Sequence, residues 1–298
     1  MIENENINKI LIAVDGSDQS LQAVRYASLV MPCKHTEVVL FYIGDKFSQL
    51  FFDMDRNPLY QSKMPELKRW MADQQMQMGN FFKVCSDILI KAGFPKNSVV
   101  VKTQTKKLSV SRDISKESYN DYTAVLMGRT GISKLKDMFV KSLATKLVGA
   151  ISHIPIIVVG GIPSSKKVLM AFDGSHSALK GLINVGLALS HSECEIMMCH
   201  LVKAGKNIEL QKEQIELDFK KAVEKIIEAG MAESAVQNKI LTVYKSLAAG
   251  IVGEAVAGDY GTIVIGRRSL VTFIEEAVIG RVSNKVLDTA SEMAVWIT

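Results

Sequence analysis

Two short segments carry the residues best suited to hold a ligand, and each directly follows an apolar run typical of a buried strand. Asp15 follows residues 10–14, and the loop Gly128-Arg129-Thr130-Gly131 follows residues 124–127. Glycines after a strand let backbone N–H groups approach an anion closely. A helix that begins soon afterwards points more N–H donors and its positive dipole end at the same place. The spacing suits a phosphate, with Ser142 near the next helix as a hydroxyl donor.

Both segments occur twice, because the chain repeats itself. Residues 9–17, Lys-Ile-Leu-Ile-Ala-Val-Asp-Gly-Ser, reappear as residues 167–175, Lys-Val-Leu-Met-Ala-Phe-Asp-Gly-Ser. Residues 121–129 match residues 259–267, but the separation has fallen from 158 to 138 residues. Ala92-Gly93 matches Ala229-Gly230 at a separation of 137, so the first half contains an insertion of about 21 residues, which we place at about 45–65. Its aromatic content predicts a partly packed loop over the first domain or a contact surface.

Each half predicts the same alternation of short apolar strands and amphipathic helices. The first half predicts strands over 10–14, 38–43, 99–101, 124–127 and 154–159, and helices over 19–31, 65–92, 110–120 and 142–152. The second half predicts strands over 168–172, 195–201, 240–243, 263–265 and 294–297. This pattern indicates a mainly parallel sheet covered on both faces. We expect an α/β protein of two tandem, doubly wound, five-stranded parallel-sheet domains, residues 1–160 and 166–298, joined by a turn-rich linker.

Composition excludes several classes of protein. With 48% hydrophobic and 22% charged residues, the chain can bury a large core. It lacks a run of 18 apolar residues and a basic, apolar leader, so we expect neither a membrane span nor secretion. Its four cysteines lack the paired spacing of disulfides or zinc sites, which favours the reducing cytoplasm. The net charge of +5 is dispersed, which argues against a nucleic acid partner.

Taken together, these features resemble the universal stress protein family over nearly the whole of both halves. ATP-binding members carry Gly-x-x-Gly, nine more residues and Gly-Ser/Thr after the fourth strand, and an Asp after the first strand near the adenosine. Here nine residues separate Gly131 from Lys141, so the spacing matches, while Lys141 replaces a glycine. The resemblance implies strand order 3-2-1-4-5 in each half, as in adenine nucleotide alpha hydrolase-like folds. It also implies a stress-response regulator that binds ATP, ADP or AMP.

By the same resemblance, the first domain would hold the nucleotide with eleven residues. They are Ala13, Val14, Asp15, Ile43, Met127, Gly128, Arg129, Gly131, Lys141, Ser142 and Leu143. Lys141 would either block the phosphate site or turn its ammonium toward the phosphates. Asp15 has a second interpretation, in which its carboxylate caps the following helix.

The second domain departs further from the family pattern. Ser269 replaces the second glycine, ten residues precede Gly280, and Arg281 replaces the hydroxyl residue. The expected second site comprises Ala171, Asp173, Leu201, Ile265, Gly266, Arg267, Ser269, Gly280, Arg281, Val282 and Ser283. We therefore expect nucleotide binding mainly in the first domain, with an altered anion site or a purely packing role for the second.

The sequence does not favour a committed enzyme, because no P-loop, serine nucleophile elbow or catalytic base can be named. The first alternative is a protein-interaction scaffold with degenerate pockets, and the second is a weak ATP hydrolase. No metal site of its own is expected, and Mg²⁺ would arrive only with the nucleotide. Cys199 and His200 are adjacent on a predicted strand and so should point to opposite faces.

Partner expectations also follow from the resemblance. The edge strands 155–159 and 294–297 should pair the two halves as an intramolecular pseudo-dimer, while a further homodimer and an unidentified protein partner stay open. Trp70, Trp296 and the methionines at helical or strand positions are expected to fill the core.

Overall fold

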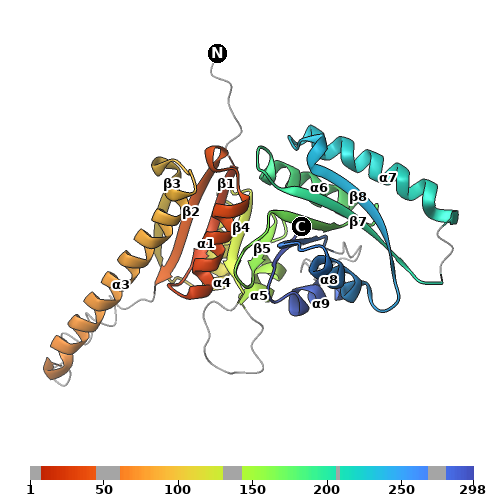
Figure 1. The fold of residues 1–298 in the computed structure, drawn as a ribbon. Coiled ribbons are helices and arrows are strands. Elements are labelled where there is room, and N and C mark those ends of the chain that lie inside the picture. The colour runs from red at the N-terminus through yellow and green to blue at the C-terminus, as the bar shows by residue number, and fades with distance from the viewer. Residues whose placement is uncertain (1–7, 45–60, 130–142, 206–208, 268–279) are drawn as a thin grey trace, which may run out of the picture.

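Runs of aliphatic residues form ten strands of one continuous sheet, with helices on both of its faces (Figure 1). The computed structural model describes residues 8–44, 61–129, 143–205, 209–267 and 280–298. Most of the expected insertion, residues 45–60, lies outside this part. Residues 61–65, which we had assigned to the insertion, belong instead to a short 3-10 helix and to the start of the following α-helix.

The first half contains five strands and four α-helices within the described residues. They are β1 (Asn8–Val14), α1 (Asp18–Val30), β2 (Thr36–Gly44), α3 (Met64–Lys91), β3 (Val99–Thr105), α4 (Val110–Glu117), β4 (Ala124–Gly128), α5 (Leu143–Ala150) and β5 (Ile156–Val159). Short 3-10 helices occupy Cys33–His35, Gln61–Lys63 and Lys96–Ser98.

The second half repeats this order. Its elements are β6 (Lys167–Ala171), α6 (His176–Leu189), β7 (Glu195–Lys203), α7 (Glu209–Glu228), β8 (Val236–Val243), α8 (Leu247–Ala257), β9 (Thr262–Ile265), α9 (Arg281–Thr289) and β10 (Ala294–Ile297), with a 3-10 helix at Glu233–Ala235. The predicted strands and helices are confirmed, with ends shifted by a few residues.

The strand order is β3-β2-β1-β4-β5-β10-β9-β6-β7-β8. Each half thus has the expected order 3-2-1-4-5, and all pairs within a half are parallel. The two halves meet where β5 and β10 pair antiparallel, with Val158 opposite Val295 and Ile157 opposite Trp296. The predicted pseudo-dimer is confirmed by this pairing.

Two hydrophobic cores lie on opposite faces of the sheet, and each one contains residues of both halves. Helices α1, α3, α6 and α7 supply side chains to one core, among them Val24, Leu182 and Phe219. Helices α4, α5, α8 and α9 supply the other, including Ile114 and Leu287. Because neither core stops at the boundary between the repeats, the halves are packed as one unit.

Helix α3 extends past the sheet in Figure 1, and this corrects one of our expectations. Its buried residues are Met64, Cys85 and Leu89, whereas Trp70 is 43% exposed and Met76 is 62% exposed. Trp70 and Met76 therefore do not fill the core, although Trp296 does, with 0% exposure. The helical period was identified correctly, but the sheet is too short to cover a helix of 28 residues.

A buried chain of hydrogen bonds crosses the seam between the halves. The indole Nε1 of Trp296 donates to the Tyr26 hydroxyl at 2.7 Å, and that hydroxyl lies 2.7 Å from Thr262 Oγ1. Tyr26 belongs to α1 of the first half, while its two partners lie on β10 and β9 of the second. Burial raises the pKa of Tyr26 far above its ordinary value, so the phenol stays protonated and able to donate.

We predict that Tyr26→Phe lowers the free energy of unfolding by about 1–3 kcal/mol, because it leaves the buried Trp296 N–H without an acceptor. The measurement is urea unfolding followed by tryptophan fluorescence. Tyr244→Phe is the matched control, since Tyr244 is 87% exposed and its change should stay within about 0.5 kcal/mol. Equal stabilities of the two variants would contradict a stabilising role for this chain of hydrogen bonds.

Candidate functional site

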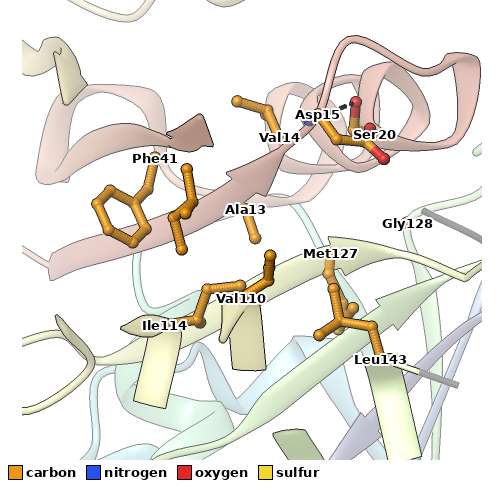
Figure 2. Close-up of a pocket in the computed structure, with 11 residues that line it drawn as sticks. Ala13, Val14, Asp15, Ser20, Phe41, Val110, Ile114, Met127, Gly128 and Leu143 are labelled. Atoms are coloured by element: carbon orange, nitrogen blue, oxygen red, sulfur yellow. Dashed lines mark hydrogen bonds between the residues drawn. The ribbon is translucent and has the colours of Figure 1, made fainter. Parts of the chain in front are cut away.

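A hollow of about 380 Å³, measured out to its open mouth, lies at the carboxyl ends of β1 and β4 (Figure 2). This is the point at which the strand order of the first half reverses, where ligands bind in open α/β sheets. The lining of the hollow consists of Ala13, Val14, Asp15, Ser20, Phe41, Ile43, Val110, Ile114, Met127, Gly128 and Leu143.

The sequence analysis named seven of these lining residues. The hollow brings together Ala13, Val14, Asp15, Ile43, Met127, Gly128 and Leu143. Gly131, Lys141 and Ser142 lie outside the described residues.

Four lining residues were missed by the sequence analysis: Ser20, Phe41, Val110 and Ile114. Helix 110–120 was predicted, and Val110 and Ile114 share one face of it at four-residue spacing. That spacing marked a buried face, but only the packing of α4 beneath the rim of the sheet could assign this face to the pocket.

The walls of the hollow are mainly aliphatic, and among the described lining residues Asp15 alone carries a formal charge. In Figure 2, Ala13, Val110 and Met127 point toward the same space between β1, β4 and α4. Aliphatic walls of this kind are suited to contact a flat, apolar ring, and a single carboxylate at the rim can accept hydrogen bonds from sugar hydroxyls.

Asp15 organises the start of α1. Its Oδ1 accepts hydrogen bonds from the Ser17 backbone N–H at 3.0 Å and from the Ser17 hydroxyl at 2.5 Å. Ser17 is the residue that caps α1, because its Oγ accepts from the Ser20 backbone N–H at 3.2 Å. Our interpretation of Asp15 as the cap itself is therefore wrong: Asp15 orients the cap. Among the described residues no bond involves its Oδ2, which leaves that oxygen available to a ligand.

Gly128 is required by close packing. A Cβ at this position would lie 2.3 Å from the carbonyl oxygen and 2.4 Å from the carbonyl carbon of Gln19. Helix α1 thus passes so near the end of β4 that only glycine fits there. The equivalent Gly266 is unlike it, since a Cβ there would first meet Ala178 Cα at 3.9 Å.

The side chains of Arg129 and Arg267, which we expected to contact the nucleotide, instead bond to helix carbonyls, and neither lines the hollow of the first half. The Arg129 guanidinium donates to the carbonyls of Leu287 and Ala290 at the end of α9. Arg267 Nη1 donates to the Val148 carbonyl, in α5, at 2.8 Å. Burial lowers the pKa of Arg129, against the opposing effect of Asp288 and Glu292, and burial lowers the pKa of Arg267 to about 10.

The second rim has the same backbone plan with different side chains. Asp173 Oδ1 accepts from the Ser175 N–H at 3.0 Å, as Asp15 does from Ser17, but Asp173 is exposed. The Ser283 hydroxyl donates to the Gly266 carbonyl at 3.1 Å, which ties α9 to the end of β9.

The other residues expected at the second rim are spread between sheet and surface. Ala171, Leu201, Gly280 and Val282 are half-buried, Ile265 is buried, and Arg281 is exposed beside the Gly280 that precedes α9. Ser269 lies outside the described residues.

Within the described residues, no group of three or more His, Cys, Asp or Glu side chains is arranged to hold a metal ion. Cys199 belongs to one core, whereas the His200 ring lies 6.4 Å from that of Phe219, which belongs to the other. Their side chains therefore point to opposite faces of β7, as predicted. In that same part of the chain, no helix is long and apolar enough to cross a membrane.

Comparison with protein families places both halves in one family. The sequence model of the universal stress protein family matches residues 6–160 and again residues 164–297. The chain belongs to the universal stress protein family. Two tandem domains of this family thus account for the repeat found in the sequence. A search of curated proteins gave no match.

Two solved structures that match nearly the whole chain support the fold of this tandem universal stress protein. One from Archaeoglobus fulgidus DSM 4304 is 17% identical with a TM-score of 0.64, covering 99% of this chain and 98% of that chain. A functionally unknown protein from Pseudomonas aeruginosa PAO1 is 16% identical with a TM-score of 0.53, covering 98% of this chain and 92% of that chain. A universal stress protein from Archaeoglobus fulgidus, solved in complex with dAMP, is 19% identical with a TM-score of 0.36, covering 46% of this chain and 98% of that chain.

We predict that Gly128→Ala lowers the free energy of unfolding by at least about 1–3 kcal/mol, because the added methyl overlaps the Gln19 backbone. Gly266→Ala is the matched variant and should change it by less than about 1 kcal/mol. Thermal and urea unfolding measure both. A destabilisation of equal size in the two variants would show that the close approach at Gly128 is not the cause.

Proposed function

We propose that the first domain binds an adenine nucleotide in the hollow at the ends of β1 and β4, and that the protein acts as a stress-response regulator. The observation that carries the proposal is the convergence of Ala13, Asp15, Met127 and Gly128 on one space at the switch point of the sheet. These residues come from the ends of two strands that lie more than 100 positions apart in the chain, and the family resemblance had assigned all four to one site.

The chemistry of the lining supports a definite orientation. The adenine ring would lie between the aliphatic side chains of Ile43, Val110 and Met127, and the ribose would meet the open Oδ2 of Asp15. The phosphates would then extend past Gly128 toward the glycine-containing loop of the family pattern. Mg²⁺ would enter this site only as the companion of the nucleotide phosphates.

Binding is favoured over catalysis because the lining offers little acid–base chemistry. Asp15 is the titratable residue among the described lining side chains, and its Oδ1 is already engaged by Ser17. A general base must reach the proton that it removes, and a carboxylate held at the sugar end of the slot is poorly placed for attack on a phosphate.

The first test is calorimetric titration of the purified protein with ATP, ADP and AMP, together with Tm shifts. We expect binding of at least one nucleotide, with stabilisation of about 2.7 kcal/mol at a concentration one hundred times Kd. Ala13→Leu fills the slot and should weaken binding by about tenfold or more, the equivalent of roughly 1.4 kcal/mol. Ala171→Leu makes the same change at the second rim and should leave the first site unchanged.

Three results would overturn this proposal. Absence of heat and of any Tm shift at millimolar nucleotide would leave the scaffold alternative, with both pockets degenerate. Turnover of ATP that survives rigorous purification and disappears in Asp15→Ala would instead establish a hydrolase. Loss of binding in Ala171→Leu with retention in Ala13→Leu would move the site to the second domain.

A further inference from the structure

Two arginines cross the seam in opposite directions at equivalent positions of the repeat. Arg267, at the end of β9 in the second half, donates from Nη1 to the Val148 carbonyl of α5 in the first half, at 2.8 Å. Arg129, at the end of β4, donates to the Leu287 carbonyl of α9 in the second half, and also to the Ala290 carbonyl. Val148 and Leu287 occupy the same place in their helices, two residues before the last.

These carbonyls are the ones that a helix leaves without partners at its carboxyl end. At the end of α5, the Ile151 N–H donates to the Leu147 carbonyl at 2.8 Å, whereas the Val148 carbonyl accepts its hydrogen bond from Arg267. A cation at this end also faces the negative pole of the helix dipole. Each guanidinium therefore anchors the carboxyl end of a helix that belongs to the other half.

The Arg267 guanidinium is buried and, within the described part of the chain, is held by a single hydrogen-bond partner. Its Nε and Nη2 atoms are inaccessible to solvent and have no hydrogen-bond partner among the described residues, so the Val148 carbonyl is the contact that fixes the side chain there. Burial without a nearby carboxylate explains why its pKa falls to about 10. While the guanidinium stays buried, loss of the Val148 carbonyl would leave its charge without any hydrogen-bond partner from the described residues, which is costly.

Helix α5 connects this anchor to the hollow. Its first residue, Leu143, lines the hollow, while Val148 near its other end receives Arg267. Helix α5 also packs against α4, whose Val110 and Ile114 line the same space. A helix of eight residues spans only about 12 Å, so a shift at one end is transmitted to the other.

We propose that Arg267, although it belongs to the second domain, is a positioning residue for the nucleotide site of the first domain. It holds α5 in the place that forms one wall of the hollow. Arg129 holds α9 beside the second rim in the same way. The inference rests on the proposed function, because it concerns the affinity of that same site.

The test compares Arg267→Met, Arg267→Lys and Arg129→Met in the full chain, with AMP and ATP titrations and amide hydrogen exchange. Arg267→Met should raise Kd by about twofold to thirtyfold, the range found for residues that act on a site through packing. Exchange of amides in 143–150 should quicken in the same variant without nucleotide. Arg267→Lys keeps a cation at the helix end and should recover part of the lost affinity.

Arg129→Met is the matched control, and a demanding one, since Arg129 follows the pocket residue Gly128 directly in the sequence. It should quicken exchange in α9 rather than α5 and leave Kd of the first site within about twofold, below the range of a coupled residue.

An unchanged Kd in Arg267→Met, or an equal loss of affinity in Arg129→Met, would overturn the inference while leaving the proposed function intact. Failure of the unchanged protein to bind any nucleotide would remove the proposed function and this inference together. Unaltered exchange in α5 of Arg267→Met would overturn the inference even without a ligand.

Discussion

The antiparallel pairing of β5 with β10 is the contact on which the rest of the structure depends. Each of these four-residue strands would otherwise be the open edge of a five-stranded sheet, with unpaired N–H and C=O groups. All residues of both strands are apolar and buried, so exposing either strand to water would be unfavourable. Pairing them closes both edges at once and turns two sheets into one of ten strands.

This junction also explains why polar groups are found deep in the seam. The sheet brings Tyr26, Thr262 and Trp296 together in the interior, where each polar atom must find a partner. It also brings the end of β4 next to α9 and the end of β9 next to α5, so that Arg129 and Arg267 each reach helix carbonyls of the other half. Helices α5 and α9, which lie beside the two rims, are therefore each anchored by an arginine of the opposite repeat.

The two halves share a backbone plan but have diverged at the rim. In the first half, Gly128 admits α1 at very close range, and Phe41 and Ser20 help to close the hollow. At the equivalent positions of the second half, a Cβ on Gly266 would make only an ordinary contact, at 3.9 Å from Ala178 Cα, and Cys199 and Ala178 are smaller than Phe41 and Ser20. The same strand order thus produces unequal rims, which is consistent with the greater departure of the second half from the family's glycine pattern.

Much of the protein could be predicted from the sequence, because strand and helix periodicity, the Asp-Gly-Ser turns and the internal repeat are local patterns. They determined the α/β class, while the strand order, the edge pairing and seven residues of the hollow were implied by the family resemblance. The roles of Arg129, Arg267 and Trp70 could not be read in this way. Arg129 looked like a phosphate ligand because it stands inside the glycine loop, yet its guanidinium reaches a helix end 158 positions away. Trp70 was expected in the core because it keeps the helical period, yet it is exposed because α3 extends beyond the sheet. Sequence specifies which faces are apolar and where turns occur, whereas the direction of a long side chain depends on which distant backbone groups lack partners, and only the packed structure decides that.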